Sequence, residues 1–212
     1  MITFLKTARS GIDMNLLVFR KPVKVYRSDA CPAGLGGYSS DGNAWRWYIP
    51  KDLQFRASIN LLEHMGSKVT PWIDKIKGRL KKGDCYLSMT DSSTSEGWAK
   101  KSNFTELIED PVQAEVRIEV CRKDAKRNLE DKLKDYSQWF PGAQNDVADA
   151  LSRDHDRTDE ELTYLLFKFC PSQMPRHFKI APLPAEINSY LISVLQKLPV
   201  KKQLQENTPG PR

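Results

Sequence analysis

The chain has 212 residues, of which 40% are hydrophobic and 28% are charged, and its formal net charge at pH 7 is +6. This balance is typical of a globular protein with one ordinary domain plus extensions, and it excludes a disordered or membrane-spanning chain. Residues 1–19 also lack the continuous apolar core of a signal peptide. We therefore expect an intracellular protein of the cytoplasm or nucleus, with a polyanion such as nucleic acid as its partner and no membrane partner.

Four cysteines are scattered along the chain, at Cys31, Cys85, Cys121 and Cys170. They form no C-x-x-C pair, and no histidine lies at ligand spacing from them. This pattern argues against a zinc site and against a disulfide framework. We expect all four to be reduced and to serve as packing residues.

The N-terminal stretch, residues 1–21, has apolar residues at helical spacing and carries no chemistry of its own. We expect it to form a short tether helix that leads from a further domain upstream, such as a polymerase domain. The main domain is then expected to begin at residue 22.

Three consecutive antiparallel strands are predicted at the start of the main domain. VKVYRSDA, residues 23–30, alternates with period two, and GLGGYSS and AWRWYIP follow, joined by the hairpin turn Asp41-Gly42-Asn43. Asp29 falls at the C-terminal edge of the first strand, next to small, turn-forming residues that leave its carboxylate accessible. This stretch alone favours the plainer interpretation, in which Asp29 only starts a turn.

A helix is predicted next, over residues 53–68, with an apolar stripe formed by Ile59, Leu62, Met65 and Val69. Glu63 lies beside this stripe, where an unpaired carboxylate is costly to bury. Pro71, Gly78 and the basic run at residues 79–84 are expected to close the segment. A solvated helix edge is the plain alternative for an isolated glutamate.

A fourth strand, CYLSMTD at residues 85–91, repeats the design of the first, because an alternating run again ends in an aspartate, Asp91. Ser92 or Ser93 can cap the helix that follows. If the first and fourth strands are parallel neighbours, Asp29 and Asp91 lie side by side at one edge of the sheet.

The remaining elements complete an α/β pattern with a mixed sheet. A charged helix is predicted over residues 111–132, a last strand over 135–142 and a helix over 143–154, which carries Asp149 among small residues. Residues 156–212 are expected to be a helical, proline-punctuated extension with a cap at Thr158 or Asp159 and a disordered tail.

Four acids thus stand at corresponding places on strands and helices: Asp29, Glu63, Asp91 and Asp149. Brought together they would repel one another unless a divalent cation bound between them. Oxygen ligands without histidine or cysteine select Mg²⁺, with Mn²⁺ as a substitute. Two such ions can catalyse the in-line displacement of a phosphodiester.

The order of elements and acids resembles the ribonuclease H domain of retroelement reverse transcriptases of the gypsy and DIRS types. The motifs that carry the resemblance are SDACPAGLGGY, NLLEHMG, LSMTDSSTSEGW and NDVADALSRD, the last of which is similar to the signature N-x-x-A-D-x-L-S-R. Four motifs in order make a specific signal over residues 22–154. The resemblance implies a ribonuclease H-like fold with a mixed five-stranded sheet flanked by helices, within a domain of residues 22–155.

The resemblance also implies roles for individual residues. Asp29, Glu63, Asp91 and Asp149 would be both the catalytic residues and the metal ligands for hydrolysis of the RNA strand of RNA·DNA hybrids. Sugar and phosphate contacts are expected from hydroxyl, amide and basic side chains: Ser92, Ser93, Asn145, Arg79, Lys81, Lys82, Lys100 and Lys101. Each basic residue is equally consistent with a solvated surface charge.

Two alternatives stay open. The first is a catalytically inactive remnant that binds nucleic acid or connects domains of a reverse transcriptase polyprotein. Residues 136–148 contain no histidine of the kind that many family members carry before the last acid, and His155 lies beyond Asp149. The second is another nuclease or an integrase of the same general fold, against which the four-acid order and the VADALSRD ending argue.

Overall fold

A computed structural model describes residues 19–100 and 110–200, without the side chains of residues 99 and 100. Most of the predicted tether helix and the tail from residue 201 lie outside these ranges. Within them, no helix combines the length and the apolar character that crossing a membrane requires. All four cysteines have free thiols, as predicted.

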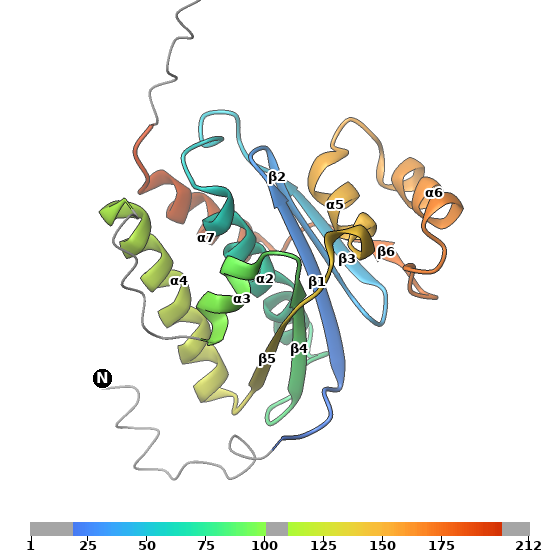
Figure 1. The fold of residues 1–212 in the computed structure, drawn as a ribbon, viewed down its shortest axis with the longest axis horizontal. Coiled ribbons are helices and arrows are strands. Elements are labelled where there is room, and N and C mark those ends of the chain that lie inside the picture. The colour runs from blue at the N-terminus through green and yellow to red at the C-terminus, as the bar shows by residue number, and fades with distance from the viewer. Residues whose placement is uncertain (1–18, 101–109, 201–212) are drawn as a thin grey trace, which may run out of the picture.

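The centre of the fold is a mixed sheet of six strands in the order β5-β4-β1-β2-β3-β6 (Figure 1). The strands are β1 (Lys24–Cys31), β2 (Gly34–Ser39), β3 (Asn43–Tyr48), β4 (Cys85–Thr90), β5 (Lys134–Trp139) and β6 (Lys179–Ile180). β1, β2 and β3 are antiparallel, as predicted from the hairpin turn. β1 and β4 are parallel neighbours, so the condition for placing Asp29 beside Asp91 is met.

Helices cover both faces of the sheet, with α2, α3, α4 and α7 on one side and α5 and α6 on the other (Figure 1). Their bounds are α2 (Ile59–Ile76), α3 (Ser93–Lys100), α4 (Pro111–Glu130), α5 (Asp146–Arg153), α6 (Asp159–Phe169) and α7 (Ala185–Gln196), with a short 3-10 turn, η2 (Gly142–Gln144), before α5. One core joins α2, α4 and α7 to Trp45 and Trp47 of β3, and a second joins α5 and α6 to Tyr38 and Ala44. The two tryptophans thus pack under helices.

Helix α2 differs at both ends from the helix predicted over residues 53–68. It begins only at Ile59, because the hydroxyl of Ser58 accepts a hydrogen bond from the Leu61 backbone N–H and caps the helix there. Ile59 is consequently 42% exposed, and Leu61 takes its place in the core. The helix then continues past Pro71 to Ile76, so the expected end near that proline was wrong.

The prediction of five strands was also wrong, because the extension contributes a sixth. β6 pairs with the start of β3, through Asn43 and Ala44. α7 packs into the main core, and the indole N–H of Trp47 donates a hydrogen bond of 2.7 Å to the side chain of Asn188. Residues 179–198 are therefore structurally part of the sheet and its core. Of the two predicted caps of α6, Thr158 is the one observed: its hydroxyl accepts a hydrogen bond from the Glu161 backbone N–H, and its own backbone N–H donates to the Glu161 carboxylate.

The close approach of α5 to the sheet depends on Gly36 of β2. A Cβ added there would lie 2.5 Å from the carbonyl carbon and the Cβ of Leu151, and 2.7 Å from the backbone nitrogen of Ser152. We expect Gly36→Ala to destabilise the protein by about 1–3 kcal/mol, since backbone atoms of α5 must move. Urea denaturation followed by circular dichroism measures this change.

Gly97→Ala is the matched control, because a Cβ at Gly97 of α3 meets nothing within 4 Å. Alanine is the better helix former, so this variant should gain up to about 1 kcal/mol. Equal effects of the two substitutions would contradict the packing argument.

Candidate metal centre

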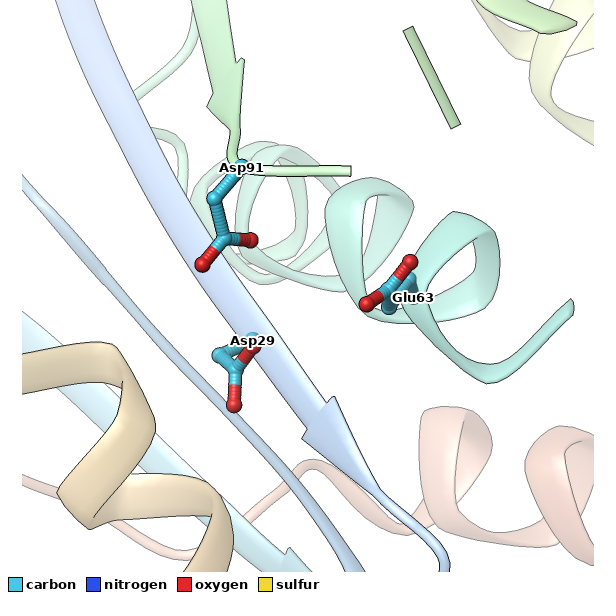
Figure 2. Close-up of side chains that lie close together, drawn as sticks. All are labelled: Asp29, Glu63 and Asp91. Atoms are coloured by element: carbon cyan, nitrogen blue, oxygen red, sulfur yellow. The ribbon is translucent and has the colours of Figure 1, made fainter. Parts of the chain in front are cut away.

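Three of the four predicted acids converge at one edge of the sheet. In the parallel pair of β1 and β4, Arg27 lies opposite Met89, so Asp29 and Asp91 follow at the same level two residues later. Glu63 reaches them from α2, and Figure 2 shows the three carboxylates beside one another. One oxygen from each acid lies within 4.8 Å of the others. The sequence thus placed three acids correctly at a common site.

The spacing of these oxygens fits a small divalent cation. Two oxygens bound to one Mg²⁺ are at most about 4.2 Å apart, because each bond is about 2.1 Å long. The three oxygens lie within 4.8 Å of one another, at most about 0.6 Å beyond this limit, so small side-chain rotations can bring them onto one ion. An all-carboxylate set favours Mg²⁺ or Mn²⁺ over zinc or copper. Asp29, Glu63 and Asp91 are therefore chemically suited to hold the predicted ion.

Electrostatics in the metal-free site favour protonation of Asp29. Its side chain is only 6% exposed. Burial, together with repulsion from Asp91 and Asp149, raises the pKa of Asp29 to about 6, against the hydrogen bond from Ser152. Burial likewise raises the pKa of Glu63, reinforced by the nearby charges of Asp91 and Asp29. A bound dication would reverse both tendencies.

The raised pKa of Asp29 predicts a pH-dependent stability difference. Between the ordinary pKa of 3.8 and the folded value of about 6, the native state holds more protons than the unfolded state. The contribution of this bound proton to the stability of the folded state is therefore fully present below about pH 4 and is lost as the pH rises through 6. In metal-free buffer, Asp29→Asn should be as stable as the wild type at pH 4 and more stable by up to about 3 kcal/mol at pH 7.

Urea denaturation at pH values from 4 to 7 tests this expectation. Asp52→Asn is the control, because Asp52 is an exposed carboxylate in the loop between β3 and α2. Its difference from the wild type should stay near zero at every pH. A gap between Asp29→Asn and the wild type that does not change with pH would refute the prediction.

Two buried polar side chains, Asn145 and Ser152, donate hydrogen bonds to Asp91 and Asp29. Asn145, fully buried just before α5, donates hydrogen bonds to the backbone carbonyl of Ser28 (3.2 Å) and to a carboxylate oxygen of Asp91 (3.3 Å). The hydroxyl of Ser152 donates a bond of 2.7 Å to Asp29. The expected role of Asn145 was direct contact with sugar or phosphate, whereas its buried position makes it a support for Asp91.

Asp149 lies near the site but outside the group of three. Its side chain is half exposed on α5 and accepts a hydrogen bond from the guanidinium of Arg153, one turn along the helix. His155 packs its ring against Tyr48 and contacts the Ser152 backbone carbonyl at 2.8 Å. The two contacts join His155 to β3 and to the C-terminal end of α5.

Of the predicted hydroxyl and basic contacts, Ser92 lies at the acids, where its hydroxyl donates a hydrogen bond to Glu63 and opposes the burial that raises the pKa of that carboxyl. Arg79, Lys81 and Lys82 are not gathered there. Ser92 caps α3 by accepting a hydrogen bond from the Ser95 backbone, and Ser93 is exposed in the first turn. Lys81 and Lys82 precede β4 whereas Asp91 follows it, so roughly 20 Å of strand separates them from the site. Lys101 and the side chain of Lys100 lie outside the described part of the chain.

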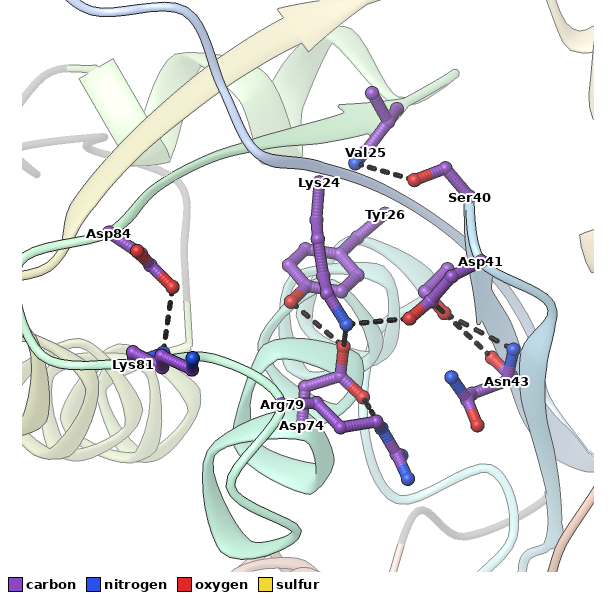
Figure 3. Close-up of polar contacts among 11 residues, drawn as sticks. Lys24, Val25, Tyr26, Ser40, Asp41, Asn43, Asp74, Arg79, Lys81 and Asp84 are labelled. Carbon is purple, nitrogen blue, oxygen red and sulfur yellow. Dashed lines mark hydrogen bonds and ion pairs between the residues drawn. The ribbon is translucent and has the colours of Figure 1, made fainter.

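Arg79 belongs to a separate polar cluster at that far end, around the fully buried carboxylate of Asp74 (Figure 3). Asp74 pairs with Lys24 at 2.9 Å and with Arg79 at 2.8 Å, and it accepts a bond of 3.1 Å from the hydroxyl of Tyr26. Arg79 thus anchors the end of α2.

Sequence reasoning missed the supporting roles of Ser152 and Arg153. Both stand in the quoted motif NDVADALSRD, three and four residues after Asp149, where they share a helix face with it. Their contacts with Asp29, more than 120 residues earlier, depend on how α5 docks on the sheet.

Comparisons with protein-family models, curated proteins and solved structures found no match for this chain.

Proposed function

We propose that the chain is a retroelement-derived ribonuclease H that hydrolyses the RNA strand of RNA·DNA hybrids with two divalent metal ions. The observation that carries the proposal is the group of three carboxylates within 4.8 Å at the C-terminal edge of two parallel strands. The order of β1, β2, β3, α2, β4, β5 and α5 also agrees with the ribonuclease H-like pattern that the motifs imply. The extra strand β6 lies at the far edge, beyond β3.

In this proposal each side chain has a defined task. Asp29, Glu63 and Asp91 hold the cation with one oxygen each, while Asn145 and Ser152 restrict the rotation of Asp91 and Asp29. Asp149, on the exposed face of α5, completes the set for a second ion. Bound ions would activate a water molecule and stabilise the negative charge that develops on the departing oxygen.

The reaction is an in-line displacement at phosphorus. The oxygen of water forms a bond to phosphorus, the bond to the 3′ oxygen breaks, and the products carry a 5′ phosphate and a 3′ hydroxyl. A polyanionic substrate suits the net charge of +6. Glu63 and Asp91 are partly exposed at the C-terminal edge of the sheet, where a long substrate can reach them.

A second candidate is a catalytically inactive module that binds nucleic acid or connects domains of a polyprotein. The observation in its favour is that Asp149 pairs with Arg153 and does not join the other three acids. On this reading, the acids are remnants that bind metal weakly.

Cleavage of an RNA strand labelled at its 5′ end tests the proposal. The full chain is incubated with an RNA·DNA hybrid, single-stranded RNA or duplex DNA, in Mg²⁺, in Mn²⁺ or in chelator. We expect cutting of the hybrid alone, only with metal, and products ending in a 3′ hydroxyl. Absence of cutting by a folded protein in both metals favours the inactive module, whose hybrid binding is then measured against salt.

A further inference from the structure

The guanidinium of Arg153 lies beside two of the four acids, Asp29 and Asp149. Its Nε pairs with Asp149, and its Nη2 lies 3.9 Å from the carboxylate oxygen Oδ2 of Asp29. Asp29 is 6% exposed, whereas Asp149 and Arg153 are 51% and 53% exposed. One side chain therefore spans the two acids that flank the proposed second ion.

The positive charge of Arg153 reduces the repulsion among the carboxylates when no cation is bound. Four carboxylates near one another raise the free energy of the folded state, and a positive charge between two of them offsets part of that cost. The Asp29 oxygen Oδ2 that faces the guanidinium also accepts the hydrogen bond from Ser152. Asp149, which pairs with the same guanidinium, lies outside the group of three acids.

We propose that Arg153 is a built-in counter-ion that competes with the second divalent cation for Asp149 and Asp29. The inference rests on the proposed function, because it presupposes that the three-acid group holds a first ion. A second ion binds only when Asp149 releases Arg153. Exposed ion pairs are weak, so a dication can displace the guanidinium at a modest loss of affinity. Arg153 thus sets the metal concentration at which the site becomes fully loaded.

Binding of Mn²⁺ alone to the full chain, followed by isothermal titration calorimetry and by the electron paramagnetic resonance signal of free Mn²⁺, tests the proposal without any substrate. Arg153→Ala removes the competitor, and Arg153→Lys keeps a charge but loses the fork that spans two acids. Arg157→Ala is the matched control, since Arg157 is similarly exposed and pairs with Asp154 at 4.0 Å.

We expect the wild type to bind one ion tightly and a second more weakly. Arg153→Ala should bind the second ion about fivefold more tightly, which is the upper end of what an exposed pair contributes. Arg153→Lys should fall between the two, and Arg157→Ala should match the wild type.

A second-ion affinity in Arg153→Ala that equals or falls below that of the wild type overturns the role of Arg153, while the first ion still supports the proposed function. Failure of the wild type and all variants to bind any Mn²⁺ overturns both. The two failures are therefore distinct in one titration.

Discussion

Asp91→Asn is expected to abolish hybrid cleavage, with a loss well above 100-fold, while leaving the fold intact. Changes to residues that only support a metal ligand cost 10- to 100-fold, so removal of a charged ligand should cost more. The substitution keeps the volume of the side chain, and the new amide oxygen can still accept the hydrogen bond from Asn145. Initial rates of cleavage in Mg²⁺ measure the loss, and circular dichroism checks the fold.

The same variant gives a result that does not depend on activity. Asp91 is one of the charges that raise the pKa of Asp29, so this pKa should move back toward its ordinary value in Asp91→Asn. A carbon-detected NMR titration of the aspartate carboxyls measures it. Asp52→Asn should leave both the rate and the pKa of Asp29 unchanged. Full activity of Asp91→Asn would show that Asp91 is not a catalytic metal ligand.

Asp74→Ala is expected to destabilise the protein by about 3–5 kcal/mol, the largest effect on stability that we anticipate. Asp74 is fully buried, and its carboxylate meets the charges of Lys24 and Arg79 and the hydroxyl of Tyr26 (Figure 3). Removal of one member of a buried ion pair leaves its partners with uncompensated charge. Urea denaturation at pH 7 measures the change in the free energy of unfolding.

Asp41→Asn is the control for this prediction. Asp41 is the other partner of Lys24, at 2.7 Å, but its side chain is 43% exposed. An exposed pair contributes at most about 1 kcal/mol, so the loss should be several times smaller than in Asp74→Ala. Similar losses in the two variants would show that burial of Asp74 does not control its contribution.

We expect the loss of Asp74 to change stability without changing metal binding, because Asp74 and the three acids lie at opposite ends of the sheet. Asp74 lies at the end of α2 where β4 begins, whereas Glu63 lies on the first turns of the same helix. At temperatures where Asp74→Ala remains folded, its affinity for Mn²⁺ should equal that of the wild type. The two variants thus test stability and chemistry independently.

The amino-acid sequence by itself determined the elements whose signals are local. Alternation with period two predicted β1, β3 and β4, and the turn at Gly42, whose φ is +92°, joins the hairpin as expected. Helical spacing predicted α4 to within a few residues, and the capping signal at Thr158 or Asp159 predicted the start of α6. Three acids were recognised because a carboxylate at the end of a strand, or beside an apolar stripe, is unusual wherever it occurs.

Only the tertiary structure decided how the distant parts meet. β6 has two residues and no periodic signal, so its pairing with β3 depends on α7 packing into the core. Asn145 and Ser152 became supports for Asp91 and Asp29 because Gly36 lets α5 lie close to the sheet. Sequence patterns report the neighbours of a residue along the chain, whereas these contacts join residues more than 50 positions apart.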